Sequence, residues 1–312
     1  MLDLLLLILG VTGLWIGTGL TVNNALTIAN QYSLSDFFVG LAILSVGSDL
    51  PELAIAVDAS IKNSLGGNVS GVVVGTSIGS VAGQMGFVLG VTGLTGYLVL
   101  PRRYVFRHGI VMLGALVVLF LAAFDGVVNR EEGIILITLY VIYVFALLRG
   151  EKMYDGEPEI QTRPRGSPWL LLALGLCVVV GSSELTVQSV ISLAGRLDIS
   201  EAFISVVIIG LGSSLPELSI SFSAILKKKA RLSVGNIIGS NILDTLLPIG
   251  IAAVISPVLF EREFLLFDLP YIFILGLITL YFFVRVRGLQ KREAAVILGM
   301  YLLYLLIKYL QQ

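Results

Sequence analysis

The sequence predicts an all-α fold, a polytopic membrane protein of ten transmembrane helices arranged as two inverted five-helix repeats. Three observations predict this fold. The chain of 312 residues is 56% apolar and only 13% charged, whereas a soluble domain carries about 25% charged residues. Long apolar segments recur along the whole chain, and one heptapeptide nearly repeats itself in the second half.

Ten apolar segments are long enough to cross about 30 Å of hydrocarbon. They lie at residues 2–28, 36–61, 71–98, 104–124, 132–148, 168–194, 200–226, 232–258, 264–284 and 293–309. The longest charged stretch separates the fifth segment from the sixth. We therefore expect a first five-helix repeat over 1–148, a cytoplasmic linker over 149–167, and a second, inverted repeat over 168–312.

The distribution of basic residues predicts the orientation in the membrane. Of the twenty Lys and Arg residues, fifteen fall on one side when the loops are counted alternately. These are Arg102, Arg103, Arg107, Arg149, Lys152, Arg163, Arg165, Lys227, Lys228, Lys229, Arg231, Arg285, Arg287, Lys291 and Arg292. Because basic loops stay in the cytoplasm, both termini are predicted to lie outside the cell membrane. An odd number of spans in each half then inverts the second half relative to the first.

The repeated heptapeptide reads GSDLPEL at residues 47–53 and GSSLPEL at residues 212–218, an offset of 165 residues. Some thirty residues after each copy comes a Gly-Ser pair followed by a further polar residue. The first pair ends at Ser80 with Gln84 four residues on, and the second ends at Ser240 with Asp244 four residues on. The same local pattern in two halves indicates one functional site built from both.

The polar residues of this repeat predict a site for a hard cation. A carboxylate in hydrocarbon costs roughly 2.5–3.5 kcal/mol on insertion scales. Four acids within the apolar spans therefore indicate a functional role, namely Asp49, Glu52, Glu217 and Asp244. Proline removes a helix hydrogen bond, which predicts free carbonyls one turn before each proline. Carboxylate, hydroxyl and carbonyl oxygens suit Ca²⁺ and Na⁺. Hydrogen bonding between helices could explain the serines but not two matched Pro-Glu breaks.

With these motifs the chain resembles the cation/calcium exchanger superfamily, and most closely the compact prokaryotic sodium/calcium exchangers. The resemblance covers the whole chain, including ten spans and both α-repeats with the patterns G-(T/S)-S-L-P-E and G-S-x-x-x-(N/D). The proton-coupled branch typically carries G-N-A-x-E, and neither repeat has this signature. The resemblance implies a core of the second, third, seventh and eighth spans, against which the first and sixth slide.

By position, the resemblance implies that Glu52 and Glu217 are the central calcium ligands, assisted by the carbonyls of Ser48 and Ser213. It further implies sodium sites formed by Ser48, Asp49, Ser80, Gln84, Ser213, Ser214, Ser240 and Asp244, with carbonyls near Ser45 and Gly210. Several Na⁺ and one Ca²⁺ would then compete for overlapping positions, which gives antiport.

Two residues depart from the family pattern. Asp49 stands where serine is usual, and Gln84 stands where asparagine or aspartate is usual. Like charges disfavour joint ionisation, so the extra acid beside Glu52 motivates an alternative to a Na⁺/Ca²⁺ antiporter, namely exchange of Ca²⁺ or another divalent cation for H⁺. An intramembrane protease is a more remote alternative, since Gly-x-Gly-Asp and His-Glu-x-x-His are both missing. A channel is a third class, and ion flux that requires a counter-ion gradient would distinguish antiport from both.

The remaining composition restricts cofactors and partners. His108 and Cys177 are the only residues of their kinds, which argues against zinc, haem and iron–sulfur groups. We expect no cofactor apart from the transported Ca²⁺ and Na⁺, the lipid bilayer as surroundings, no nucleic acid, and no need for an oligomer. Asp268 is expected at the membrane interface, and a role for Glu184 in the sixth span stays open.

Overall fold

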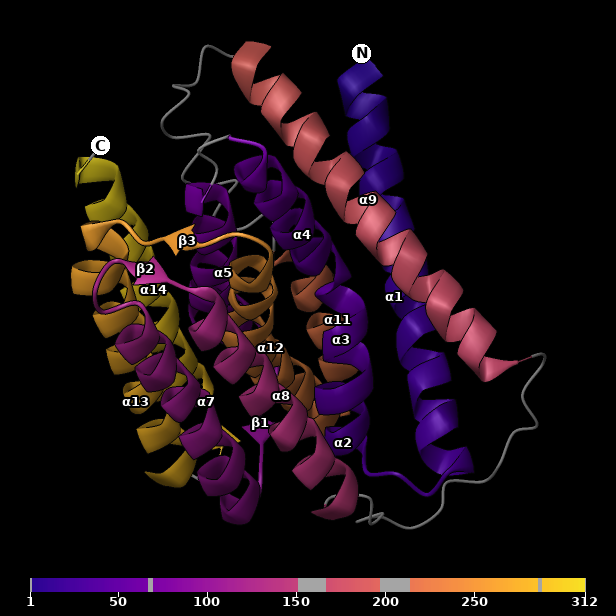
Figure 1. Ribbon diagram of the computed structural model, residues 1–312. Coiled ribbons are helices and arrows are strands. Elements are labelled where there is room, and N and C mark those ends of the chain that lie inside the picture. Colours follow the sequence, from indigo (N-terminus) through magenta and orange to yellow (C-terminus); the bar gives the residue numbers. More distant parts are fainter. Residues whose placement is uncertain (1, 67–69, 151–166, 197–213, 286–287, 312) are drawn as a thin grey trace.

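The computed structural model describes residues 2–66, 70–150, 167–196, 214–285 and 288–311, and these form a bundle of long helices (Figure 1). In chain order, the first half contains α1 (Leu2–Gln31), α2 (Asp36–Val39), η1 (Gly40–Leu44), α3 (Ser45–Ser48), α4 (Leu50–Ser64), α5 (Ser70–Gly83), η2 (Gln84–Val88), α6 (Leu89–Thr95), β1 (Leu98–Val99), α7 (Arg102–Ala122), β2 (Val127–Val128) and α8 (Arg130–Gly150). The second half contains α9 (Pro168–Arg196), α11 (Leu215–Leu226), α12 (Ala230–Ile255), β3 (Val258–Leu259), η4 (Phe264–Asp268), α13 (Leu269–Arg285), β4 (Gly288–Leu289) and α14 (Lys291–Gln311).

The all-α membrane fold predicted from the sequence is confirmed. Among the described residues, eight helices are long and apolar enough to cross a membrane, and the pair α2–α3 and α4, bent by 41°, makes a ninth span. Each begins and ends within a few residues of its predicted segment. Of the predicted seventh span, only α11 lies within the described residues, and residues 200–213 lie outside them.

Two short antiparallel ladders connect the halves of the chain. Strand β1 pairs with β4, and β2 pairs with β3. Strands β1 and β3 follow the third and eighth predicted spans, so they occupy equivalent positions in the two halves, as do β2 and β4. Exchanging the halves therefore turns one ladder into the other. The ladders lie at opposite ends of the bundle (Figure 1), as two inverted halves require.

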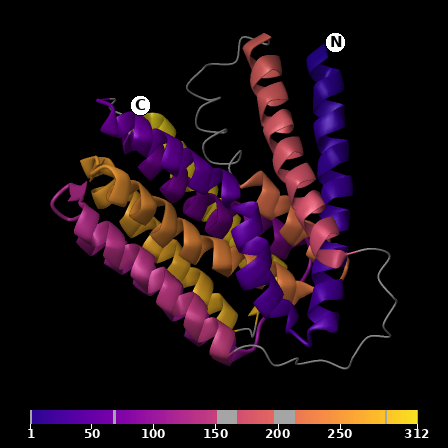
Figure 2. The same ribbon diagram turned by 45° about the vertical axis from the view of Figure 1, so that its right-hand side comes forward.

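Helices α1 and α9 pack along each other and run obliquely past one side of the bundle (Figures 1 and 2). A Cβ atom on Gly10 would lie 2.4 Å from Thr186 Oγ1, and one on Gly175 would lie 2.6 Å from Thr21 Oγ1. These two contacts are counterparts, because the repeat offset of 165 residues relates Gly10 to Gly175 and Thr21 to Thr186. Small residues let membrane helices approach closely, and here they do so symmetrically.

Helix α12 passes through the centre of the bundle and contacts α4, α5, α8 and α11. Its glycines bring it against the backbone of the second span. A Cβ on Gly235 would lie 2.4 Å from the Phe37 carbonyl oxygen, and one on Gly239 would lie 2.4 Å from that of Leu41. This crossing, backbone against backbone, brings the polar middle of α12 close to the break between α3 and α4.

Candidate functional site

From its third residue onward, each copy of the heptapeptide has the same local structure. Asp49 separates α3 from α4 with φ −89° and ψ 5°, and Ser214 precedes α11 with φ −94° and ψ 6°. In each copy proline lies at the start of the following helix, where its missing N–H costs nothing. Glu52 and Glu217 therefore lie in the first turns of α4 and α11, where the helix dipole favours negative charge.

Two π-helical turns adjoin the site. Turn η1 lies directly before α3, and η2 begins at Gln84. Such turns widen a helix locally and are frequent at functional sites. Irregular backbone at membrane depth is tolerated only where protein or a polar cavity surrounds it. The irregular turns and the break at Asp49 thus lie where the polar side chains gather.

Four carboxyl groups are buried together between these elements. Asp49, Glu52, Glu217 and Asp244 are each at most 3% exposed. The carboxyl groups of Asp49 and Glu217 are close neighbours, and the charges of Glu52 and Asp244 also act on Asp49. Two ionised carboxylates repel, so this contact is favourable only when a proton or a cation lies between them. Within the described part of the chain, none of the four forms an ion pair with Lys or Arg.

Hydrogen bonds connect the first repeat to the second across the site. Ser80 Oγ donates to Asp244 Oδ2 at 2.8 Å, and Gln84 Nε2 donates to the same oxygen at 2.8 Å and to Ser80 Oγ at 3.0 Å. The long Gln84 side chain thus reaches the carboxylate from the opposite half. Since its amide nitrogen faces the carboxylate, its Oε1 points elsewhere and has no partner.

The serines of the first break form a local chain of hydrogen bonds. Ser48 Oγ donates to the Ser45 carbonyl at 3.2 Å and to Asp49 Oδ1 at 3.3 Å, and the Asp49 N–H donates to the Ser45 carbonyl at 3.0 Å. Ser45 Oγ donates to the Leu41 carbonyl. The Ser45 carbonyl is therefore occupied twice, and a cation bound there would displace the Ser48 hydroxyl.

In the second half, the site residues stand on α11 and α12. Ser214 Oγ makes one long contact, 3.5 Å to the Ser80 carbonyl, and Ser240 Oγ is buried without a hydrogen-bond partner. Ser213 and Gly210 lie outside the described residues. Asn241, which follows Ser240, was not predicted. Its side chain is fully buried and its Oδ1 has no hydrogen-bond partner. The sequence feature that could have indicated it is its position directly after the Gly-Ser pair.

Buried oxygen atoms without a hydrogen-bond donor distinguish this region. They are Asp49 Oδ2, Glu52 Oε2, Gln84 Oε1, both Glu217 carboxylate oxygens, Asn241 Oδ1 and Asp244 Oδ1. A buried polar atom left unpaired costs about 1–3 kcal/mol. Within the described residues no three His, Cys, Asp or Glu side chains are grouped closely enough to hold one metal ion. The donors are therefore a mixed set of carboxylate, hydroxyl and amide oxygens spread over neighbouring positions.

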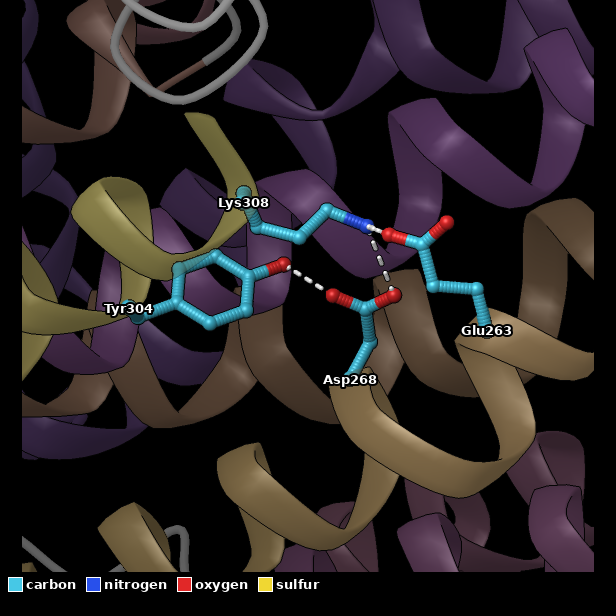
Figure 3. A network of polar contacts seen from close by, with 4 residues as sticks. All are labelled: Glu263, Asp268, Tyr304 and Lys308. Carbon is cyan, nitrogen blue, oxygen red and sulfur yellow. Dashed lines mark hydrogen bonds and ion pairs between the residues drawn. The ribbon is translucent and has the colours of Figure 1, made fainter. Parts of the chain in front are cut away.

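Asp268 shows how this protein compensates a buried carboxylate elsewhere (Figure 3). Its side chain is fully buried near the start of the predicted ninth span, and its two oxygens accept from Tyr304 Oη at 2.6 Å and Lys308 Nζ at 3.1 Å. Lys308 also pairs with Glu263. This carboxylate has a basic partner, which the central four lack within the described residues.

Two other acids stand apart from the site. Asp58 forms an exposed pair with Lys62, with a distance of 2.6 Å between Nζ and Oδ2. Glu184 is exposed on α9, where its Oε1 accepts from Gln188 Nε2 at 2.8 Å. Neither contributes to the group of buried carboxylates.

The long apolar helices, the related halves and the buried acids between them define a multi-pass membrane protein of the inverted-repeat class. The family model described as "Sodium/calcium exchanger protein" matches residues 2–149 and 167–310. The chain belongs to this family, which confirms the resemblance noted in the sequence. It is therefore a transporter and not an enzyme, so the intramembrane protease alternative is wrong.

Known proteins resemble the chain over most of its length. It is 26% identical to the sodium/calcium exchanger MaX1 of Methanosarcina acetivorans, over 98% of each protein. It is also 26% identical to the inner membrane protein YrbG of Escherichia coli, over 74% of this chain and 73% of that protein. A solved structure of the sodium-calcium exchanger NCX_Mj superposes with a TM-score of 0.82 at 24% identity, covering 97% of both chains, and shares the fold.

Asp268 has a basic partner and Asp49 has none among the described residues, so neutralising these two acids should have opposite effects on the stability of the protein. Asp49→Asn should raise the thermal stability of the ion-free protein, because it removes one of the repelling charges. Asp268→Asn should lower the free energy of unfolding by about 1–3 kcal/mol, because it weakens the bonds to Tyr304 and Lys308. The measurement is thermal unfolding in detergent, with choline replacing sodium and a calcium chelator present. Shifts of the same sign would contradict the proposed repulsion at Asp49.

Proposed function

We propose that this chain is a secondary active antiporter that exchanges Ca²⁺ for Na⁺ across the cell membrane. The observation that carries the proposal is the set of unpaired buried oxygens at the two Pro-Glu breaks. Oxygen donors of this kind suit Ca²⁺, which takes six to eight of them with flexible geometry. Four acids without a basic partner make a cation the natural source of compensating charge.

The roles follow from position. Glu52 and Glu217 would hold Ca²⁺ from the first turns of α4 and α11, with help from the carbonyls of Ser48 and Ser213. Na⁺ would use the surrounding hydroxyl, amide and carboxylate oxygens, including those of Ser80, Ser214 and Ser240. The carbonyls near Ser45 and Gly210 would complete these positions. Because both ions need the same carboxylates, one must leave before the other binds.

Exchange rather than one-way transport follows from charge. An empty site would move several buried carboxylates between the two membrane faces without compensation, which is costly. A site loaded with Ca²⁺ or with several Na⁺ is largely neutralised and can change access. Sliding of α1 and α9 past the rest of the bundle would provide this change, and their oblique contact along one side supports that role.

The remaining organisation completes the proposal. Residues 1–148 and 168–312 would be the two inverted repeats, joined by a cytoplasmic linker over 149–167, with both termini outside the cell. One chain supplies both halves of the site, so a second copy is not required. The similarity to MaX1, a sodium/calcium exchanger, supports sodium as the coupling ion.

Proton coupling is the second candidate, and one contact favours it. Asp49 faces the carboxyl groups of Glu217, Asp244 and Glu52, and the phenol of Tyr140 lies near it on α8. In the absence of a cation, a shared proton would relieve the repulsion between Asp49 and Glu217. Release of that proton on Ca²⁺ binding would make the protein a Ca²⁺/H⁺ exchanger, or an exchanger of another divalent cation for H⁺.

Glu52→Gln and Glu217→Gln should each abolish calcium transport. Each substitution removes one negative charge and one bidentate carboxylate from the Ca²⁺ site. The measurement is Ca²⁺ uptake into proteoliposomes under an imposed sodium gradient, with uptake falling to that of protein-free vesicles. Glu184→Gln, an exposed acid on α9, is the matched control and should transport normally. Near-normal uptake by Glu52→Gln would overturn the site assignment.

The substitution Asp49→Ser tests whether Na⁺ or H⁺ is the coupling ion. It removes one carboxylate and restores the residue usual in the family, so we expect calcium exchange with a flatter pH dependence and weaker calcium binding. Exchange should also depend more strongly on the sodium gradient. Wild-type transport should weaken as pH falls, because protons compete with the cation for the buried carboxylates. Calcium flux is measured against pH and against the sodium gradient in both proteins, and superimposable profiles would refute a coupling role for Asp49.

The orientation is tested by labelling. On a Cys177→Ala background, single cysteines at positions 228 and 312 are treated with an impermeant thiol reagent in intact cells. Position 312 should react and position 228 should react only after lysis, because basic loops stay inside. The reverse pattern would show that the termini face the cytoplasm.

A further inference from the structure

A cavity of about 720 Å³ opens where α11 meets α12, at the end of the bundle predicted to face the cytoplasm. Basic side chains dominate its lining. They are Lys227, Lys228, Lys229 and Arg231, and they share the cavity with the carboxyl group of Asp36 and the ring of Tyr97. Four positive charges against one negative charge favour an anionic ligand.

Two of these lysines lack a carboxylate partner. Lys229 Nζ pairs with Asp36 Oδ2 at 3.6 Å. Lys227 Nζ instead donates to neutral oxygens on α1, the Gly19 carbonyl at 3.3 Å and Asn23 Oδ1 at 2.6 Å. Lys228 is exposed, and within the described part of the chain its side chain forms no ion pair or hydrogen bond. The ammonium group of Lys227 thus has neutral oxygens as its partners, and partial burial lowers its pKa.

A second cavity meets the first at Lys227. It has about 670 Å³ and runs between α1 and α11. Its lining is mostly apolar, with Leu14, Trp15, Ile16, Leu20, Phe222 and Leu226 along it. A basic cavity and an apolar groove that share one lysine match an amphiphile with a negative head, whereas a small soluble anion would use only the basic cavity.

We propose that these two cavities bind an anionic phospholipid of the cytoplasmic leaflet, with its phosphate beside Lys227 and Lys228 and one acyl chain in the groove between α1 and α11. Basic pockets between membrane helices on this side are suited to such headgroups. The lipid would lie between α1, which is expected to slide, and α11, which belongs to the core. A lipid that fits one arrangement better than the other would shift the balance between them.

The charge of the cavity is tested first. Purified protein in detergent is titrated with phosphatidylglycerol, phosphatidylcholine and glycerol phosphate, and bound ligand is counted by native mass spectrometry. Phosphatidylglycerol should bind best. The double variant Lys227→Gln/Lys228→Gln should weaken its binding roughly 30-fold, from the usual contribution of two lysines at an anionic surface. Lys228→Gln alone, which removes an exposed side chain, should weaken it by a smaller factor and serves if the double variant does not fold.

The matched control removes two charges from the same predicted face. Lys291 and Arg292 are exposed and lie outside both cavities, so Lys291→Gln/Arg292→Gln should leave phosphatidylglycerol binding nearly unchanged. An equal loss in this control would overturn the proposal, because it would show only general attraction to a basic face. Equally tight binding of glycerol phosphate would also overturn it and assign the basic cavity to a soluble phosphate.

The groove is tested by filling it. Gly19 lines the groove, and a Cβ placed on it meets no atom within 4 Å, so Gly19→Leu should occupy the space without displacing the helices. It should weaken phosphatidylglycerol binding several-fold while leaving glycerol phosphate unaffected. Gly299→Leu on α14, where a Cβ is equally free, should change neither. Unchanged phosphatidylglycerol binding in Gly19→Leu would refute the acyl-chain position.

Discussion

Four buried carboxyl groups without a basic partner set the main constraint on this protein. Burial in a helix bundle removes the water that would otherwise solvate Asp49, Glu52, Glu217 and Asp244. The bundle offers Asp244 only the neutral donors of Ser80 and Gln84. The contrast with Asp268, which has Lys308 and Tyr304, shows that the fold can compensate a buried acid when its charge must stay fixed. The four central carboxyl groups have no such basic partner within the described residues, so their charge is available to a bound cation.

Reciprocal contacts between the two halves hold this arrangement in place. The contacts of Gly10 with Thr186 and of Thr21 with Gly175 are counterparts under the same offset that relates the two heptapeptides. The two short ladders at opposite ends are related in the same way. Under the proposed antiport, such paired contacts would allow a second arrangement in which the two halves exchange roles.

The sliding pair and the basic end of the bundle are connected through one residue. Lys227 belongs to the end of α11, yet its ammonium group binds oxygens on α1. Any movement of α1 along the bundle must break or exchange these bonds. A negatively charged headgroup at the same lysine would compete with them, so the membrane itself could influence the position of α1. The charge of Lys227 and the charges of the central carboxyl groups would then both influence the movement of α1.

The sequence by itself determined the membrane fold, the places of the spans and the two Pro-Glu breaks, because apolar length, proline and buried acids leave few alternatives in hydrocarbon. It also pointed to the family through both repeats. Only the tertiary structure decided which polar groups meet. The bond from Gln84 to Asp244 and the approach of Asp49 to Glu217 join residues about 160 positions apart. The buried Asn241, whose Oδ1 has no hydrogen-bond partner, had no marked counterpart in the first repeat. Local pattern fixes a residue's helix and face, whereas partners across the bundle depend on how closely glycines let the helices approach.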